Sequence, residues 1–167
     1  MRVERLNSSH DLSGFSCGIK SLDNWLREHA LDNQRRDLSR TYVLIDDSNH
    51  VVGYYSLTMG GVQRDHLPKR YAHGLPSFDV GMVLLGRLAV GEGHKGIGLG
   101  RDLIIEAVER AADAGLLVAA KFISVDPIDE SARSFYAHFG FKVVSGDDQG
   151  RKYLRIDEAL AVFEDSE

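Results

Sequence analysis

The sequence predicts an α+β fold (an α/β three-layer arrangement) in which helices flank a mixed central sheet. Three patterns lead to this prediction. An apolar run at 82–90 passes through a glycine-rich turn into apolar residues at helical spacing, which Gly115 is placed to end. A further apolar run at 118–125 would return as a strand parallel to the first. Two β-rich runs, 41–45 and 51–59, are joined by a short polar turn, as in a hairpin.

Composition is that of an ordinary globular chain, with 43% hydrophobic and 27% charged residues, so residues 1–167 are expected to form a single domain. No apolar run approaches the ~20 residues of a membrane span, and the start of the chain has no signal-peptide core. Cys17 is the only cysteine, which excludes an intrachain disulfide and a thiolate zinc cluster and fits a cytoplasmic protein. No metal site is expected.

The net charge of −5 argues against indiscriminate nucleic-acid binding, although a local basic patch could still serve. Such a patch occurs where a helix, capped by Ser21, is expected to run to about Asp37. Arg35, Arg36 and Arg40 lie at its end. Because cations stabilise a helix C-terminus, the residues alone favour that role over contact with a phosphate backbone.

Residues 60–81 form a long irregular segment, and a segment of this length in a compact domain is a candidate substrate wall. His66 and His73 within it could be general bases, but a loop histidine is more often a solvated side chain. Farther along, we expect a helix capped by Asp129 or Ser131 and stopped by Gly140, a hairpin of strands 141–144 and 152–156 across the turn 145–151, and a frayed acidic tail at 164–167.

The glycine-rich turn at 91–100 could seat a phosphate, because several backbone N–H groups and a helix N-terminus would face one ligand. Its first glycines match the dinucleotide pattern G-x-G-x-x-G. In that register Gly98 and Gly100 would lie in the early turns of the helix, where each glycine destabilises the helix by about 0.8–1 kcal/mol relative to alanine. It also places Asp126, the candidate ribose ligand, about 30 residues after Gly96, the last glycine of the pattern, whereas the usual spacing is ~20 residues. The Walker A pattern fails, because Ile97 stands where its lysine belongs.

Residues 95–100, K-G-I-G-L-G, instead resemble the pyrophosphate loop of GNAT-family acetyltransferases, Q/R-x-x-G-x-G/A, with the helix starting at about Leu99. Lys95 stands where Gln or Arg is usual, which keeps the charge but loses planar hydrogen bonding. Residues 135–141, F-Y-A-H-F-G-F, resemble the family's C-terminal signature F-Y-x-x-F-G-F. By itself Tyr136 would be interpreted as a core aromatic residue, and the resemblance implies that it is the catalytic acid.

The resemblance further implies the acyl-CoA N-acyltransferase fold of the GNAT family and acetyl-CoA as the cofactor. The pantetheine arm would pair with the strand at 88–90, and the turn would hold the pyrophosphate. The residues implied in cofactor binding are Leu88, Ala89, Val90, Lys95, Gly96, Gly98, Leu99, Gly100, Arg101, Ser131 and Phe135.

A string of N-terminal residues narrows the resemblance to one branch of the family. These are Phe15, Cys17, Gly18, Leu22, Asp23, Trp25, Leu26, Ala30, Gln34, residues 39–43 and residues 53–57. They resemble GNAT toxins of type II toxin–antitoxin modules, which acetylate the amino group of aminoacyl-tRNA and stop translation. The resemblance implies a homodimer neutralised by a ribbon-helix-helix antitoxin. It also makes Arg35, Arg36, Arg40 and Arg87 expected tRNA contacts.

The chemistry would be direct attack of a neutral amine on the thioester. An α-amino group has a pKa of ~7.7–8.0, whereas a lysine at ~10.4 needs about 4 kcal/mol of help to be neutral at pH 7. We find no acidic pair, and no histidine on a scaffold element near Tyr136, to act as a base, so an α-amine fits better. Three alternatives stay open: a GNAT enzyme for a small amine or a protein N-terminus, a coenzyme-A-binding or antitoxin-docking module without turnover, and a dinucleotide-binding protein.

Overall fold

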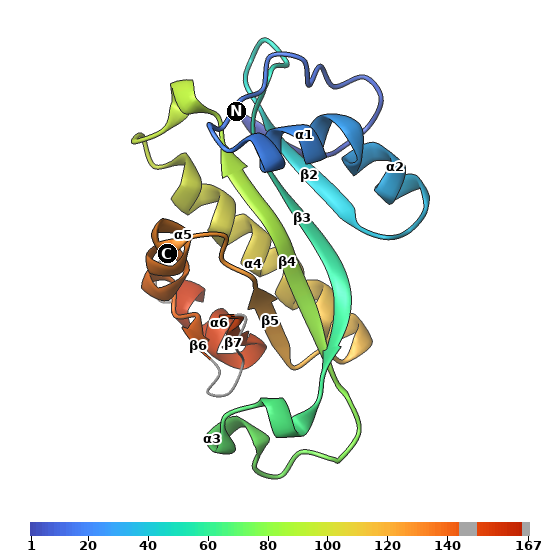
Figure 1. The fold of residues 1–167 in the computed structure, drawn as a ribbon, viewed down its shortest axis with the longest axis vertical. Helices are drawn as coiled ribbons and strands as arrows, with labels where there is room; N and C mark the ends of the chain where they lie inside the picture. Colours follow the sequence, from blue (N-terminus) through green and yellow to red (C-terminus); the bar gives the residue numbers. More distant parts are fainter. Residues whose placement is uncertain (144–149, 165–167) are drawn as a thin grey trace. The chain divides into compact units, whose positions relative to one another are not determined.

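A computed structural model describes residues 1–143 and 150–164 and contains one seven-stranded sheet in the order β1-β2-β3-β4-β5-β7-β6 (Figure 1). The strands are β1 Arg2–Arg5, β2 Arg40–Ile45, β3 Val51–Val62, β4 Val80–Val90, β5 Phe122–Val125, β6 Lys142–Val143 and β7 Lys152–Arg155. The helices are α1 Lys20–Glu28, α2 Ala30–Arg35, α3 Lys69–Ala72, α4 Leu99–Val118, α5 Glu130–His138 and α6 Ile156–Glu164, with 3-10 turns η1 Arg64–His66 and η2 Glu92–His94.

The sheet is mixed, as predicted. Strands β1, β2 and β3 pair antiparallel, β4 and β5 pair parallel through α4, and β7 pairs antiparallel with both β5 and β6. The chain forms two compact units: Met1–Thr58 with Gly86–Ala107, and Met59–Leu85 with Val108–Glu167. We call them the first and the second unit. Strands β3 and β4 and helix α4 contribute residues to both.

Aromatic side chains form the core of the first unit. Tyr54 is fully buried, stacks on Trp25 with ring centroids 6.1 Å apart, and meets Phe15 edge to face at 5.6 Å. On β3, Gly53 leaves room for α4, because a Cβ atom there would lie 2.7 Å from Leu103 Cδ1. A side chain at this position would force Leu103 to shift, so the glycine favours the close packing of α4 on the strand.

The first helix differs from its prediction. Instead of one helix to about Asp37, there are two, α1 and α2, separated by His29 with φ −123° and ψ −29°. Ile19 is the N-terminal cap, so Ser21 lies inside α1 and caps nothing. After α2, Asp37 takes a left-handed φ of 58°, which ends the helical path. Hydrophobic spacing alone did not reveal the break at His29, because the buried residues Leu26, Ala30 and Gln34 keep a four-residue spacing across it.

Gln34 of α2 ties the helix to the sheet. Its buried side-chain N–H donates to Leu6 O at 2.6 Å, and its side-chain oxygen accepts from Thr41 N–H at 3.2 Å. A buried amide that lost these partners would carry a desolvation cost of about 1–3 kcal/mol. Gln34, which the resemblance picked out, therefore has a structural function.

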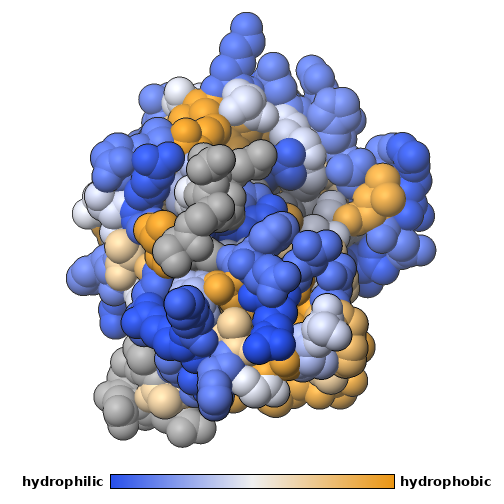
Figure 2. Space-filling view, turned by 60° about the horizontal axis from the view of Figure 1, so that its bottom comes forward, coloured by the Kyte–Doolittle hydropathy of each residue, from blue (hydrophilic) through white to orange (hydrophobic). Residues whose placement is uncertain are grey.

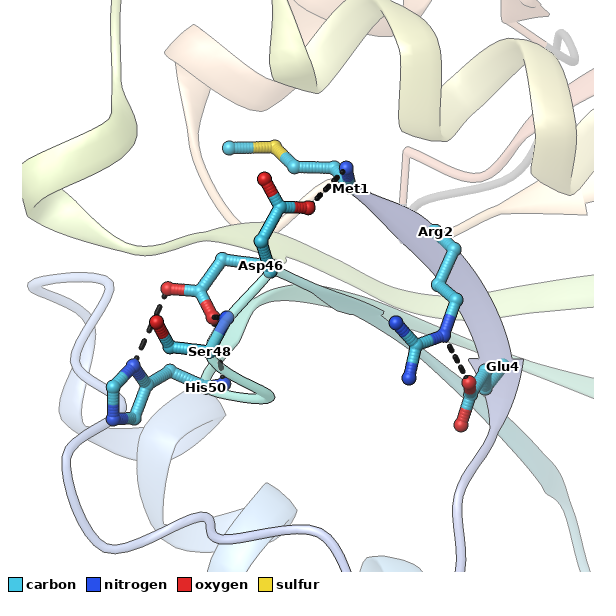
Figure 3. A network of polar contacts seen from close by, with 7 residues as sticks. Met1, Arg2, Glu4, Asp46, Ser48 and His50 are labelled. Carbon is cyan, nitrogen blue, oxygen red and sulfur yellow. Dashed lines mark hydrogen bonds and ion pairs between the residues drawn. The ribbon is translucent and has the colours of Figure 1, made fainter.

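The hairpin turn predicted between β2 and β3 is present and is organised by Asp46 (Figure 3). Asp46 Oδ1 accepts from the backbone N–H groups of Ser48 at 2.9 Å and His50 at 2.8 Å. The bond from His50 is the largest of several contacts that lower the pKa of Asp46. The chain's amino terminus reaches the same turn, since the Met1 ammonium lies 3.3 Å from Asp47 Oδ1. Asn49 completes the turn with a φ of 67°.

Residues 60–81 are less irregular than predicted. Strand β3 continues to Val62, β4 begins at Val80, and η1 and α3 lie between them. Leu67 and Tyr71 from this stretch are buried in the core of the second unit. The other members of that core are Val62, Met82, Phe122 and Tyr153. The adjacent Gly60 and Gly61 at the end of β3 and two short helical turns give no regular hydrophobic pattern, so this order could not be predicted from periodicity.

Gly115 does not end its helix. Helix α4 continues to Val118 and stops at Ala119, whose φ is 61°, with Ala120 N–H donating to Gly115 O at 2.8 Å. A Cβ atom at Gly115 would lie 2.3 Å from Ile156 Cδ1, so the glycine serves close packing. The predicted strand at 118–125 accordingly shortens to β5.

The C-terminal helix α6 was not predicted; it follows β7 directly, where the sequence analysis ended a strand at Ile156. The predicted turn at 145–151 lies largely outside the described residues, as do Val144 and the tail beyond Glu164. None of the helices in the described ranges is long and apolar enough to cross a membrane.

Candidate acetyltransferase site

The glycine-rich turn after β4 belongs to the first unit. Past η2 and Lys95, Gly96 and Gly98 adopt φ angles of 79° and 92°, which other residues take only with strain. Asp102 N–H donates to Gly98 O at 3.2 Å as α4 begins. The helix therefore starts at Leu99, the register that the GNAT-like pattern predicts.

The turn leaves backbone amides open to a ligand. The first N–H groups of a helix have no partner inside it. A Cβ atom added at Gly96 or Gly98 would meet no heavy atom within 4 Å, so an anion can approach the main chain there. Leu99 and Gly100 are half-buried and Arg101 is exposed in the first turn of α4. Open amides, the helix N-terminus and a nearby guanidinium fit a diphosphate.

A second segment, residues 15–18, braces this turn. Glu92 N–H donates to Ser16 O at 2.8 Å, and Lys95 Nζ donates to Cys17 O at 2.6 Å. The Lys95 ammonium, which the sequence placed at the pyrophosphate, thus also holds the turn against the N-terminal segment. The sequence alone gave no sign of this second partner.

Asp23 holds the segment beside the glycine turn, a role that the sequence analysis did not assign to it. Its buried carboxylate accepts from Cys17 N–H at 2.8 Å and from Ser16 Oγ at 3.3 Å. Burial, followed by the Asp23 carboxylate, raises the pKa of the Cys17 thiol, which keeps that thiol protonated. Asp23 thus fixes the segment that braces the glycine turn. In the sequence, Asp23 stood out only as one of the N-terminal residues that resemble the toxin branch of the family.

The strand expected to bind the pantetheine arm forms the end of β4 in the first unit. Ala89 is buried, and Leu88 and Val90 are half-buried. Strand β5 pairs with β4 only as far as Leu85, opposite Val125, so residues 86–90 have no partner in β5. Unpaired strand amides can bind an extended ligand in the manner of an added strand.

Tyr136 lies on α5 in the second unit, and burial raises the pKa of its phenol above the ordinary value. Its ring packs edge to face on Phe135 at 5.4 Å and on Phe141 at 5.6 Å. Among the described residues no hydrogen-bond partner of the hydroxyl is found. Phe135 and Phe139 of the same aromatic signature are only half-buried, because the helix turns Tyr136 inward instead.

The N-terminus of α5 is capped as predicted, since Asp129 Oδ1 accepts from Ala132 N–H at 2.8 Å. Ser131 is exposed in the first turn. The sequence analysis overlooked His138, which is on the same helix as Tyr136. Its side chain is exposed and meets Phe139 edge to face at 5.2 Å. Two positions along a helix correspond to nearly opposite faces, so His138 does not share the face of Tyr136.

The arginines at the end of α2 are largely engaged with neighbours. Arg36 pairs with Asp32 at 3.5 Å, and Arg40 pairs with Asp37 at 2.6 Å while also donating to Gln34 O at 3.2 Å. Arg35 is exposed. We call Arg35, Arg36 and Arg40 the helix-end patch.

Arg87 on β4 has a different setting. Its guanidinium carbon lies 4.0 Å from the centroid of the Trp25 ring, and Trp25 itself stacks on Tyr54. Burial lowers the pKa of Arg87 below its usual value. No carboxylate pairs with it in the part of the chain that the structure describes. A half-buried, flat cation on an aromatic stack can receive an anion or a nucleobase.

The predicted residues fall into two groups. The helix-end patch, Arg87, residues 88–90 and the turn belong to the first unit, while Ser131, Phe135 and Tyr136 belong to the second. Asp126, the dinucleotide candidate, is occupied by a two-point ion pair with Arg151 at 2.6 and 2.8 Å. In the described ranges no three His, Cys, Asp or Glu residues gather as metal ligands.

Comparison with known proteins agrees with this geometry. Residues 10–141 match the acetyltransferase (GNAT) family. The chain is 35% identical over 161 residues to a tRNA-acetylating toxin of Mycobacterium tuberculosis, covering 96% of this chain and 95% of that protein. It is 25% identical over 142 residues to a probable toxin TacT of Sinorhizobium fredii, covering 80% and 78%.

Solved structures are similar over nearly the whole chain. AtaT in complex with acetyl-methionyl-tRNAfMet superposes with a TM-score of 0.89 at 28% identity, covering 97% of this chain and 98% of that one. A tyrosine-to-phenylalanine mutant of KacT gives 0.90 at 26%, with the same coverage. The family match and the full-length relatives therefore show that the chain belongs to the GNAT acetyltransferase family.

Proposed function

We propose that this protein transfers the acetyl group of acetyl-CoA to the α-amino group of aminoacyl-tRNA and so blocks translation as a toxin. The observation that carries the proposal is its full-length similarity to a tRNA-acetylating toxin, at 35% identity. The similarity to AtaT bound to acetyl-methionyl-tRNAfMet supports the same substrate.

Acetyl-CoA fits the residues present. The open amides at Gly96 and Gly98 and the exposed Arg101 would hold the diphosphate, with Lys95 adding positive charge. Residues 88–90 would align the pantetheine arm, and Ser131 and Phe135 would complete the cofactor contacts on α5. The cofactor supplies an acetyl group activated as a thioester. A neighbour of the same fold, an AtaT mutant, was solved with acetyl-CoA.

Tyr136 would act as the general acid. Because burial raises its pKa, the phenol keeps its proton throughout the physiological pH range. It would give this proton to the departing sulfur, whose thiol has a pKa of ~8.5 in its usual state. Backbone N–H groups of residues 88–90 would steady the negative charge that develops on the carbonyl oxygen.

The incoming amine needs little help. An α-amino group with a pKa of ~7.7–8.0 is partly neutral at pH 7, so attack does not demand a strong base. His138 is exposed and on another face of α5, and His66 and His73 are exposed in the stretch between β3 and β4. The site is therefore suited to an α-amine rather than to a lysine side chain.

Arg87 and the helix-end patch are the proposed tRNA contacts in the first unit. The Tyr54–Trp25–Arg87 stack would present a flat cation to the tRNA end that carries the amino acid. Arg35 has no ion pair with any residue that the structure describes, whereas Arg36 and Arg40 would have to exchange carboxylates for phosphates.

We further propose that the chain works as one domain in a homodimer in the cytoplasm and is neutralised by a ribbon-helix-helix antitoxin. Structures of AtaT bound to the antitoxin AtaR support an antitoxin partner. Strands β3 and β4 and helix α4, which run through both units, support a single domain.

A second candidate is a GNAT enzyme that acetylates a small amine or a protein N-terminus. The ion pairs of Arg36 and Arg40 favour it, because a surface already neutralised attracts RNA less. A module that binds coenzyme A without turnover would retain the glycine turn but would not need Tyr136.

The decisive experiment incubates the protein with labelled acetyl-CoA and a pool of charged tRNA, and then identifies the acetylated amino acid. Label in N-acetyl-aminoacyl-tRNA is the expected result. Label only in free amines or peptides would select the second candidate, and cofactor binding without transfer to any amine would select the binding module. Expression in a bacterium should arrest growth unless an antitoxin is co-expressed; harmless overproduction would contradict the toxin function.

A further inference from the structure

The segment between β3 and β4 carries a cluster of cations that nothing above uses. Residues 63–73, which we call the α3 segment, contain Arg64, Lys69 and Arg70 against one acid, Asp65. All four side chains are exposed. Within the described part of the chain, none of the three cations has an ion-pair partner, whereas two of the three cations in the helix-end patch do.

The backbone under these cations is well anchored. Leu67 and Tyr71 are 5% and 8% exposed in the core of the second unit, and Tyr71 meets Phe122 edge to face at 6.1 Å. Backbone bonds fix the turns, with Tyr71 N–H donating to Pro68 O at 2.8 Å. The cations therefore project from a defined platform, and binding through them costs little ordering of the main chain.

Arg70 is also oriented. Its guanidinium carbon lies 4.6 Å from the centroid of the Tyr71 ring, so the flat cation rests on a buried aromatic side chain. Figure 2, which brings the end carrying α3 forward, shows a face covered mostly by hydrophilic side chains with smaller hydrophobic patches. An exposed arginine held in this way offers its N–H edge to a phosphate.

Charge balance indicates what this surface binds. The chain carries a net charge of −5, which repels a polyanion, so RNA needs a local excess of positive charge. The α3 segment has three cations and one acid within eleven residues. In the helix-end patch, two of the three cations are already paired with Asp32 and Asp37. The α3 segment is thus the more positive of the two surfaces.

We propose that the α3 segment is a tRNA-binding surface that contacts the sugar–phosphate backbone through Arg64, Lys69 and Arg70. This inference rests on the proposed function, because it assigns to the same substrate a contact with its sugar–phosphate backbone. Backbone contacts of this kind position an RNA without reading its sequence. The surface therefore favours tRNA over a short aminoacylated fragment and does not select the amino acid.

The test is a triple variant, Arg64→Gln with Lys69→Gln and Arg70→Gln, titrated with charged tRNA across a range of salt concentrations. Each lost phosphate contact removes ~0.7–0.9 from the slope of log K against log salt, so the slope should fall by about 2–3. The ratio of kcat/KM for charged tRNA to that for an aminoacylated 3′-terminal fragment should fall about 10- to 100-fold.

The matched control removes three exposed cations in separate elements, none of which forms an ion pair with another described residue: Arg5→Gln with Lys20→Gln and Lys121→Gln. It changes the net charge equally, and its salt slope should stay that of the parent protein. An unchanged slope in the α3 variant, or an equal fall in the control, would overturn the inference. If the parent protein itself neither binds nor acetylates charged tRNA, the proposed function fails instead. Thermal unfolding of both variants checks that these surface changes leave the fold intact.

Discussion

The glycine turn in the first unit is held by polar contacts, whereas the Tyr136 side chain in the second unit is held by aromatic packing. Lys95 and the backbone of Glu92 bond to residues 15–18, and the turn's own amides stay open. Tyr136 instead lies between Phe135 and Phe141 without a hydrogen-bond partner among the described residues.

The difference follows from the task of each part. A diphosphate is bound by amides that already point the right way, so the backbone must be fixed while its donors stay unpaired. A proton donor must stay neutral until the leaving group develops charge, and an apolar setting keeps it neutral. Changes in the turn should therefore appear in cofactor affinity, and changes at Tyr136 should appear in turnover.

The largest effect is expected for Tyr136→Phe, which removes only the hydroxyl. Turnover should fall by ~10²–10⁴ because the departing thiolate loses its acid, while acetyl-CoA affinity stays nearly intact. Single-turnover kinetics and equilibrium titration of acetyl-CoA measure the two quantities. Tyr153→Phe, which removes a hydroxyl from another buried aromatic residue of the second unit, is the control and should lose far less. Full turnover in the Tyr136 variant would refute the acid assignment.

The pH dependence of the parent enzyme tests whether the apolar setting of Tyr136 keeps its phenol protonated. Because burial raises the pKa of Tyr136, the phenol stays protonated well beyond pH 9. The rate should therefore rise as the substrate α-amine loses its proton near ~7.7–8.0 and should not fall again up to pH 9. A falling limb below pH 9, absent in the Tyr136→Phe variant, would mean that the phenol is more acidic than its burial implies.

A smaller effect, confined to binding, is expected for Gly98→Ala. A side chain at a φ of 92° costs at least about 1–2 kcal/mol, which the free turn can escape by relaxing but the turn around a diphosphate cannot. The Kd for acetyl-CoA should therefore rise about tenfold with little change in turnover at saturation. Gly93→Ala is the matched control, because an added Cβ atom there also meets nothing within 4 Å but its φ is not positive. Equal affinities for the two variants would show that the turn's conformation does not matter for binding.

The glycine turn could be predicted from local sequence patterns, but its contacts with distant parts of the sequence could not. Gly96, Gly98 and the start of α4 could be predicted because a glycine pattern, an apolar strand and helical spacing follow one another directly between residues 82 and 115. The bond from Lys95 to Cys17 could not, since its partners are 78 positions apart. Gly115 was misread for a similar reason: it lies next to Ile156, and nothing nearby in the sequence announces that contact.

The second unit was harder to predict. The cap at Asp129 and the stop at Gly140 are local signals and were found. Which aromatic residue of α5 turns inward depends on packing against Phe141 and the sheet, so the sequence could not tell the buried Tyr136 from the half-buried Phe135. The α3 segment was predicted as a loop, because short helical turns leave no periodic pattern.

The smallest effect is expected for Lys95→Met. This variant tests whether Lys95 supports cofactor binding through its hydrogen bond to Cys17 O or through its positive charge. Removing the ammonium takes away the bond to Cys17 O, worth about 0.5–1.5 kcal/mol, and one positive charge near the proposed diphosphate. The Kd for acetyl-CoA should rise only about two- to tenfold, because the amides at Gly96 and Gly98 remain. Lys95→Arg keeps the charge and is the control. If bracing dominates, both variants should lose affinity, since a guanidinium does not reproduce the ammonium's bond. If charge dominates, the Arg variant should bind as the parent does, and only the Met variant should show weaker salt dependence.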